Sequence, residues 1–375
     1  MNNLKVELIV IYLIFFLSNM FLVSHQLSLS NYPGDFGAAF LAVEKVFNGE
    51  IYVPHPLWYL SVHYMKFITL DGKCAAALVT SLYDMLFIYI AQNIYLYFNN
   101  NRGDIKLLLY LFIIFVIGPA YLPIFTKYIL LGVGSPNLWH NATLLTVKPF
   151  ALLTIFFTIL GMEKESRIYY ILAILTLAIS IFAKPSFVIA FLPALLIFML
   201  IKKEYSKSNI VFFISISIIA VLILLYQFLN TYSENSGSSI IVSFLTVWHK
   251  FTSNVLLSIV LALLFPIIYT ILNFKNVYNN NYIVFSWILV IISIIYAAVF
   301  AESGDRMYHG NFFWSYMISL SIIYIFVIAD YLTTKDISSK YKKMVLNIIL
   351  IWQVLIGIYC YIWVMRGLDP LSVHF

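Results

Sequence analysis

Long apolar runs separated by short polar connectors dominate the chain. The first is LKVELIVIYLIFFLSNMFLVSH near the N-terminus, and the others cover residues 74–98, 106–125, 143–161, 167–183, 186–201, 209–230, 253–273, 282–301, 312–333 and 344–365. A helix needs roughly 17 to 25 apolar residues to cross the hydrocarbon of a bilayer. The pattern therefore predicts an all-α, polytopic integral membrane protein.

One more apolar segment, PLWYLSVHYMKFITL from Pro56, is short for a crossing. Its roughly 15 residues reach about 22 Å as a helix, against a hydrocarbon core of about 30 Å. It is either re-entrant, which predicts 11 transmembrane helices, or a short crossing paired with a second one around PAYLPIFTKYILLGVG, which predicts 13. In both cases we expect residues 1–375 to form a single transmembrane domain.

Composition supports the bilayer as the solvent. Of 375 residues, 63% are hydrophobic and only 10% are charged, which is too apolar for a water-soluble domain of this size. The first apolar run has no small-residue cleavage site after it, so we interpret it as a retained span rather than a signal peptide. The two cysteines lie in apolar segments and support neither a disulfide framework nor a cysteine metal site.

The net charge of +6 is explained by the orientation of the chain in the membrane and not by nucleic-acid binding. Most lysines and arginines lie in the connectors NNNRGDIK, GMEKESR, KKEYSKS, NFKN and TTKDISSKYKK, which all fall on one side if the N-terminus is inside. Cytoplasmic loops carry such an excess, and the basic residues form no continuous stripe for a nucleic acid. None of these connectors contains a histidine, whereas most histidines fall on or beside the opposite side. We therefore expect a multi-pass protein, in a bacterial plasma membrane, with its polar chemistry on the outer face.

The longest outer loop, residues 25–56, follows the first span directly. Its DFGAAFLAVEKVFNG stretch has apolar residues at helical spacing, which predicts an interfacial helix ending near Gly49. Asp35 stands at its start, after a Pro-Gly turn. It is either the N-cap of this helix or a carboxylate over an outer cavity, where it could accept a proton from a substrate hydroxyl.

Three cations are expected at the outer ends of spans. Lys148 in VKPF and Lys184 in AKPSF each precede a proline, which marks a helix start or break, and Arg306 lies in ESGDRMYHGN with His309 three residues on. One interpretation is that these cations face a common polar cavity. Irregular backbone at membrane depth is tolerated where the backbone lines such a cavity. The alternatives are lysines that snorkel to the interface and, around Arg306, a solvated turn with Glu302.

The stretch SPNLWHNATLLTVKPF concentrates polar groups in this apolar chain. Asn137, Trp139, His140 and Asn141 are candidates to bind sugar hydroxyls or to stack on a sugar face. The alternative is an ordinary helix start in which Asn141 or Thr143 is a cap, Trp139 belongs to the interfacial aromatic belt and His140 is solvated.

The chain resembles the GT-C superfamily of integral membrane glycosyltransferases. The resemblance rests on the many spans, on Asp35 in GDF beside an interfacial helix in the first outer loop, and on the proline-rich VPHPLWYL that follows. Many members carry a paired acidic motif where this chain has a single Asp, with Glu44 and Glu50 as the nearest other acids.

The resemblance implies a polyprenyl-phosphate sugar as donor and a glycan, lipid or protein as acceptor. Asp35 would be the general base of an inverting displacement. Lys148, Lys184, Arg306 and His309 would bind the donor phosphate, and His55 would join Asn137, Trp139, His140 and Asn141 around the sugar or acceptor. No metal ligands are assigned, although a divalent cation is compatible with the family, and no nucleic-acid partner is expected.

Other functions remain open from the sequence alone. A flippase or transporter of lipid-linked sugars or small solutes would also need buried cations, and an outer-face polysaccharide polymerase or ligase would also act outside. A membrane acyltransferase would use a histidine base, for which His63 is a candidate. A purely structural subunit has no positive signature in the sequence.

Overall fold

A computed structural model describes residues 2–29, 32, 34–124, 126, 128–231, 239–334 and 339–370. Within these ranges the chain is an all-α helical bundle with one small sheet, as predicted. Seven helices are long and apolar enough to cross a membrane, or eight with one bent pair counted as a single crossing. The seven are α1 (Asn2–Ser28), α4 (Gly72–Phe98), α6 (Ala142–Lys164), α9 (Lys207–Thr231), α14 (Asn281–Val299), α15 (Phe313–Thr333) and α16 (Lys340–Met365).

The bent pair and three shorter apolar helices occupy the other predicted spans. The pair is α11 (Val255–Ala262) and α12 (Leu264–Leu272), which meet at 67°. The shorter helices are α5 (Ile105–Val116), α7 (Arg167–Ala183) and α8 (Ser186–Lys202). Every apolar run predicted from the sequence therefore contains helix.

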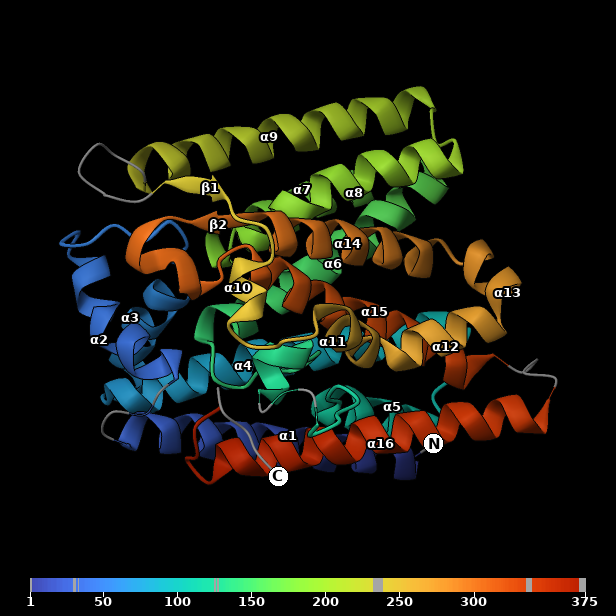
Figure 1. Ribbon diagram of the computed structural model, residues 1–375, viewed down its shortest axis with the longest axis horizontal. Coiled ribbons are helices and arrows are strands. Elements are labelled where there is room, and N and C mark those ends of the chain that lie inside the picture. The colour runs from blue at the N-terminus through green and yellow to red at the C-terminus, as the bar shows by residue number, and fades with distance from the viewer. Residues whose placement is uncertain are drawn as a thin grey trace.

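The long helices lie side by side, and the two ends of the bundle differ (Figure 1). One end, here called the α2 end, carries α2 (Asp35–Phe47), α3 (Leu57–Thr69) and an antiparallel pair of strands, β1 (Ile240–Val242) and β2 (Phe300–Glu302). The other, the α13 end, carries α13 (Phe274–Asn279). The remaining elements are α10 (Thr246–His249), the π-helix η1 (Ile129–Gly134) and the 3-10 helix η2 (Gly304–His309).

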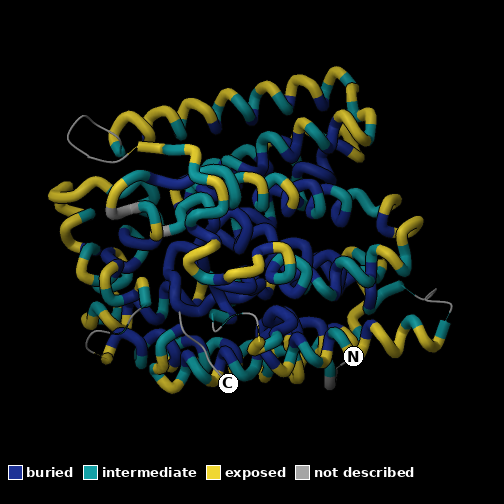
Figure 2. Tube along the Cα trace, viewed as in Figure 1, coloured by how far each residue is buried: buried dark blue, intermediate teal, exposed yellow. Residues whose placement is uncertain are grey.

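Helix α15 forms the centre of the bundle and α9 lies at its edge (Figure 2). Every residue of α15 from Phe313 to Ala329 is buried, whereas most apolar side chains of α9 are exposed. An exposed apolar helix is stable where lipid covers it, so the burial pattern agrees with a bilayer around the bundle.

The two helices of the first loop form as predicted. Helix α2 spans the DFGAAFLAVEKVF stretch and is followed by Gly49, whose φ of +73° suits glycine. The segment after Pro56 is α3, a helix of 13 residues that packs against α2 and α4.

The predicted run 106–125 becomes helical only up to Val116; Gly118 and Pro119 follow, and α16 passes close to this point. A Cβ added at Gly357 would lie 1.7 Å from the Val116 carbonyl oxygen, so only glycine fits there. The Gly118 N–H then donates to the Gln353 carbonyl at 3.2 Å, and the Ala120 N–H donates to Leu261 at 3.1 Å. The described residues of 117–141 thus form a largely buried, irregular segment, and two of its backbone N–H groups are bonded to other helices.

Candidate functional site

Four polar side chains from three distant segments are joined by hydrogen bonds at the α2 end. The Asn141 amide donates to the Asp35 carboxylate, and the Thr143 hydroxyl donates to the Asn141 side-chain oxygen at 3.1 Å. The Lys184 ammonium donates to the Thr143 hydroxyl at 2.9 Å. We call this series the Asp35–Lys184 chain. It links the predicted acid to one of the predicted cations.

Asp35 is fixed in this position by both backbone and side chain. Its N–H donates to the His140 carbonyl at 3.0 Å, while the next residue, Phe36, is fully buried with its ring edge-on to Trp58. Asp35 itself is exposed. The N-cap of α2 is Gly34, and no side chain caps this helix, so the alternative of Asp35 as an N-cap is wrong.

Asn141 does act as the N-cap of α6, since its side-chain oxygen accepts the Leu144 N–H at 2.8 Å. The capping alternative is therefore confirmed for this residue. The same side chain uses its amide group to hold Asp35, so one residue fixes both the start of α6 and the direction of the carboxylate.

Lys184 lies in the break between α7 and α8 and points into the protein. It is 6% exposed, and its ammonium is 5.1 Å from the centre of the Trp314 ring. Burial lowers the pKa of Lys184 to about 8, and the charge of Asp35 partly opposes this shift. Snorkelling to the interface is therefore wrong for Lys184, which remains a buried cation near the carboxylate.

His140 adds an unsatisfied polar atom beside the Asp35–Lys184 chain. Its side chain is buried, and its Nδ1 has no hydrogen-bond partner among the described residues. Burial lowers the pKa of His140, while Asp35 and Asp369 act in the opposite direction. The imidazole is thus neutral at pH 7 and available as a hydrogen-bonding group, and it is not solvated as the alternative proposed.

The loop after α14 approaches the same site. Glu302 at the end of β2 is 4% exposed and accepts a hydrogen bond from the Asn311 amide at 2.7 Å, and the Asn311 carbonyl accepts the Ser186 hydroxyl at 3.1 Å. The solvated-turn alternative therefore fails for Glu302. Arg306 and His309 lie in η2, and their side chains fall outside the described part of the protein.

Lys148 and Asn137 belong to a different cluster, in the interior of the bundle. The Lys148 ammonium donates to the Pro136 carbonyl and to the Asn137 side-chain oxygen, both at 3.1 Å. Asp84 is the carboxylate that acts on Lys148 electrostatically, and it accepts a hydrogen bond from Asn19. No hydrogen bond between described residues joins this cluster to the Asp35–Lys184 chain.

Trp139 and His55 each make an aromatic contact. Trp139 is 3% exposed, with its ring edge-on to Tyr361 at 5.1 Å, so it is an interior residue and not part of an aromatic belt. His55 is half-buried beside Tyr59 of α3, with ring centres 6.5 Å apart. His63 contacts Glu44 at 3.2 Å and stacks on Phe47, which gives this histidine a structural role.

The sequence-based candidates omit Asp84 and Glu302, which are buried, and Asp330, which is half-buried. Asp84 and Asp330 stand inside apolar runs, in SLYDMLF and VIADYL. That position was a usable signal, because an ionisable residue within a membrane span is expensive and marks a functional or structural site.

In chemical terms, the Asp35–Lys184 chain presents an accessible carboxylate, which can accept a proton, and a buried ammonium, which can bind an anion. No group of three or more His, Cys, Asp or Glu side chains that could hold a metal occurs within the described ranges. No family model matches the amino-acid sequence, and no curated protein matches it.

Proposed function

We propose that the protein is a membrane glycosyltransferase that moves a sugar from a polyprenyl-phosphate donor to a hydroxyl acceptor. The observation that carries the proposal is the Asp35–Lys184 chain, which joins a carboxylate to a buried cation through Asn141 and Thr143. Glycosyl transfer from a lipid phosphate needs these two groups, one to accept a proton and one to stabilise a departing phosphate.

The proposed reaction is a single inverting displacement. The free oxygen of the Asp35 carboxylate takes the proton of the acceptor hydroxyl while that hydroxyl oxygen bonds to the anomeric carbon. The bond between that carbon and the phosphate oxygen breaks, and its electrons leave with the lipid phosphate. Lys184 stabilises this developing charge, and it does so strongly because a buried cation acts through a low dielectric.

We assign the α2 end to the outer face of the membrane. The lysine-rich connectors lie at the α13 end, which the positive-inside bias places in the cytoplasm. Counting the seven long helices, the bent pair and the three shorter apolar helices gives 11 crossings, with α3 as a helix that stays at the outer end. This orientation suits a bacterial plasma membrane enzyme that uses a lipid-linked donor and a glycan, lipid or protein acceptor outside the cell.

The remaining candidates take roles according to their positions. His140 lies next to Asp35 and would bind a hydroxyl of the sugar or acceptor through its unpaired Nδ1. Arg306 and His309 remain proposed phosphate ligands from η2. Lys148, Asn137 and Trp139 act through the packing of the segment 117–141 and not through contact with the donor.

The test is donor consumption by the purified full-length protein in nanodiscs with a panel of polyprenyl-phosphate sugars. Asp35→Asn keeps the shape of the side chain and an oxygen for Asn141, so we expect the protein to fold and the rate to drop about 10²- to 10⁴-fold. Glu50→Gln, an exposed acid of the same loop, is the matched control and should keep the wild-type rate. No consumption of any donor by the wild type, or equal rates for Asp35→Asn and wild type, would exclude the proposal.

A flippase or transporter of lipid-linked sugars is the second candidate. The buried Asp84 and Lys148 favour it, because ionisable groups within membrane spans often mark a transport route. Donor labelled on the sugar distinguishes the two in sealed vesicles: a transferase releases free polyprenyl phosphate, whereas a transporter moves the label across with the sugar-phosphate bond intact.

A further inference from the structure

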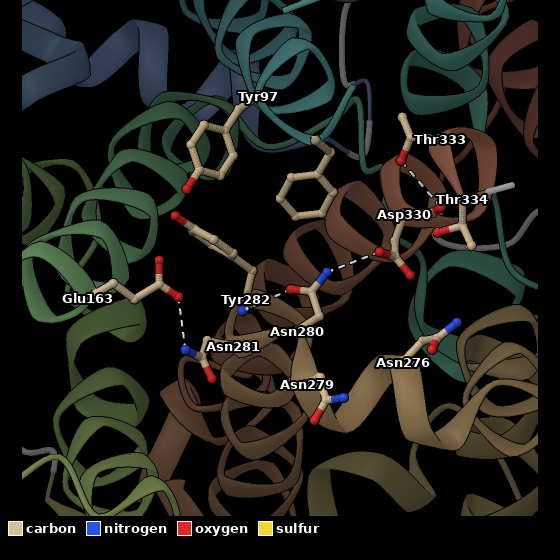
Figure 3. A pocket seen from close by; sticks show the side chains of 11 residues that line it. Tyr97, Glu163, Asn276, Asn279, Asn280, Asn281, Tyr282, Asp330, Thr333 and Thr334 are labelled. Atoms are coloured by element: carbon tan, nitrogen blue, oxygen red, sulfur yellow. Dashed lines mark hydrogen bonds between the residues drawn. The ribbon is translucent and has the colours of Figure 1, made fainter. Parts of the chain in front are cut away.

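A second polar site lies at the α13 end, at the opposite end of the bundle from α2 (Figure 1), and Figure 3 shows its side chains. It is a pocket of about 470 Å³ between the ends of α4, α6, α13, α14 and α15. This volume lies within the range of small-molecule sites, roughly 300 to 1,000 Å³. Its lining is dominated by asparagine, threonine, tyrosine and two carboxylates, so the matching ligand is polar.

Two acids give the pocket its charge, and none of the described side chains that line it is basic. Asp330 accepts hydrogen bonds from the Asn280 amide at 3.1 Å and from the Tyr269 hydroxyl, and Glu163 accepts from the Asn281 amide at 2.8 Å. All these donors are neutral. Neither carboxylate has a basic nitrogen within 4.0 Å among the described residues, so their negative charge is left for a ligand.

Lys202 is the cation that acts on Glu163 from a distance. Its ammonium is held elsewhere, by a hydrogen bond to the Tyr278 carbonyl and at 4.5 Å from the centre of the Tyr278 ring. Glu163 is therefore partly compensated. Asp330, which is half-buried and held only by neutral groups, carries most of the electrostatic attraction.

Aromatic rings form one wall. The ring of Tyr282 lies 6.0 Å from that of Tyr97 and 5.6 Å from that of Phe98. The Tyr282 hydroxyl is buried and faces the Tyr97 hydroxyl in Figure 3. Aromatic faces attract cations, and tyrosine hydroxyls can accept from an N–H donor.

We propose that this pocket binds a small organic cation that carries primary amino groups. An ammonium group donates three hydrogen bonds and is matched by carboxylate and amide oxygens, with further stabilisation from the aromatic wall. Phosphates and carboxylates have the wrong sign of charge. A neutral polyol could use the asparagines but would leave the charge of Asp330 uncompensated.

Glu163 and Asp330 lie on opposite sides of the pocket in Figure 3, which favours a ligand with an amino group at each end. The surrounding connectors are rich in lysine and repel cations from most of this face. The pocket is thus an acidic site on a basic face. Cations are therefore expected to bind at the pocket and not elsewhere on this face. The inference does not rest on the proposed glycosyl transfer.

Calorimetric titration of the full chain in a non-ionic detergent tests the proposal with two ligands of similar length, 1,4-diaminobutane and 1,4-butanediol. We expect the diamine to bind and the diol to show no binding. Asp330→Asn should weaken diamine binding at least tenfold. Glu165→Gln, which changes an exposed carboxylate near the same end but outside the pocket lining, should leave it unchanged.

A second variant tests the same pocket independently, so that the test does not depend on whether Asp330→Asn folds. Asn279 lines the pocket and is exposed, so Asn279→Lys adds a positive charge there without disturbing the core. It should also weaken diamine binding at least tenfold. Equal binding of diol and diamine, no binding of the diamine by wild type, or wild-type affinity in Asn279→Lys would overturn the proposal.

Discussion

The amide of Asn141 holds the carboxylate of Asp35 while the oxygen of the same side chain caps α6. A residue from the middle of the chain therefore positions an acid from the first loop, 106 residues away. The two functions of Asn141 can be separated by substitution, because serine caps a helix well but is too short to reach Asp35.

Asn141→Ser should leave thermal stability close to that of wild type and lower the rate of donor consumption at least tenfold, because Asp35 loses its orienting donor. Asn141→Ala should lower both, with about 1 kcal/mol lost from the missing cap. Thermal unfolding in detergent and donor turnover measure the two effects. Full activity in Asn141→Ser would show that the contact with Asp35 has no role in the reaction.

The rate should depend on pH through Lys184, whose pKa is lowered to about 8. Below this pH the ammonium is charged and stabilises the departing phosphate; above it the charge is lost. We therefore expect turnover to decline as the pH rises through about 8. A pH profile of turnover at saturating donor measures this decline.

Lys184→Arg is the matched variant, because a guanidinium stays charged to pH values above about 12. Its activity will be lower than wild type, since the larger group must fit beside Trp314, but its decline near pH 8 should disappear. If the decline persists unchanged in this variant, another group causes it.

The buried cluster around Lys148 should matter for stability. Lys148→Met leaves the Asn137 side-chain oxygen without its donor and removes the cation near Asp84, while the Pro136 carbonyl keeps the Ser321 hydroxyl as a donor. Each unsatisfied buried group costs about 1 to 3 kcal/mol. We expect a clear fall in the thermal unfolding temperature.

The double variant Asp84→Asn, Lys148→Met should be more stable than Lys148→Met alone, because it no longer leaves an uncompensated carboxylate in the interior. The unfolding temperatures of the two variants measure the difference. A double variant less stable than the single one would mean that Asp84 is satisfied by Asn19 without help from Lys148.

Gly357→Ala should prevent folding, since the new methyl group would lie 1.7 Å from the Val116 carbonyl oxygen. Gly37→Ala is the matched control: no atom lies within 4 Å of an added Cβ in α2, and alanine is the better helix former by about 1 kcal/mol. Yield and monodispersity on size-exclusion chromatography compare the two. A well-folded Gly357→Ala protein would contradict the close contact between α16 and residues 116–118.

Membrane orientation can be tested with single cysteines in a Cys74→Ser, Cys360→Ser background. Glu50→Cys at the α2 end should react with a membrane-impermeant maleimide added to intact cells, and Lys203→Cys near the α13 end should react only after lysis. Both sites are exposed or half-buried polar positions. The reverse labelling pattern would place Asp35 in the cytoplasm.

Hydrophobic patterning predicted where the apolar helices lie, because lipid selects apolar runs without regard to their neighbours. Of these helices, seven, or eight with the bent pair, are long enough to cross a membrane. The start of α2 at Asp35 and of α3 after Pro56 also follow from local signals. The predicted run 106–125 passed over the local stop signal Gly118-Pro119, which follows the end of α5 at Val116. The close approach of α16, which needs glycine at position 357, could not be predicted, because the two residues are far apart in the sequence.

The candidate site was predicted only in part, for a similar reason. The sequence identified Asp35, Lys184, His140 and Asn141 as polar groups at one end of the bundle, and the structure places them together. It grouped Lys148 with Lys184 because both precede proline. A lysine well inside α6 and a lysine in a helix break differ in depth, and local sequence does not encode depth.

The irregular segment 117–141 determines when the protein can finish folding during biosynthesis. The carbonyls that accept from Gly118 and Ala120 belong to Gln353 and Leu261, which leave the ribosome long after the segment itself. Until then these two N–H groups lack the acceptors that the folded protein gives them. The C-terminal helix is therefore the part that completes the interior, and a nascent chain without it would expose an unfinished core to the membrane.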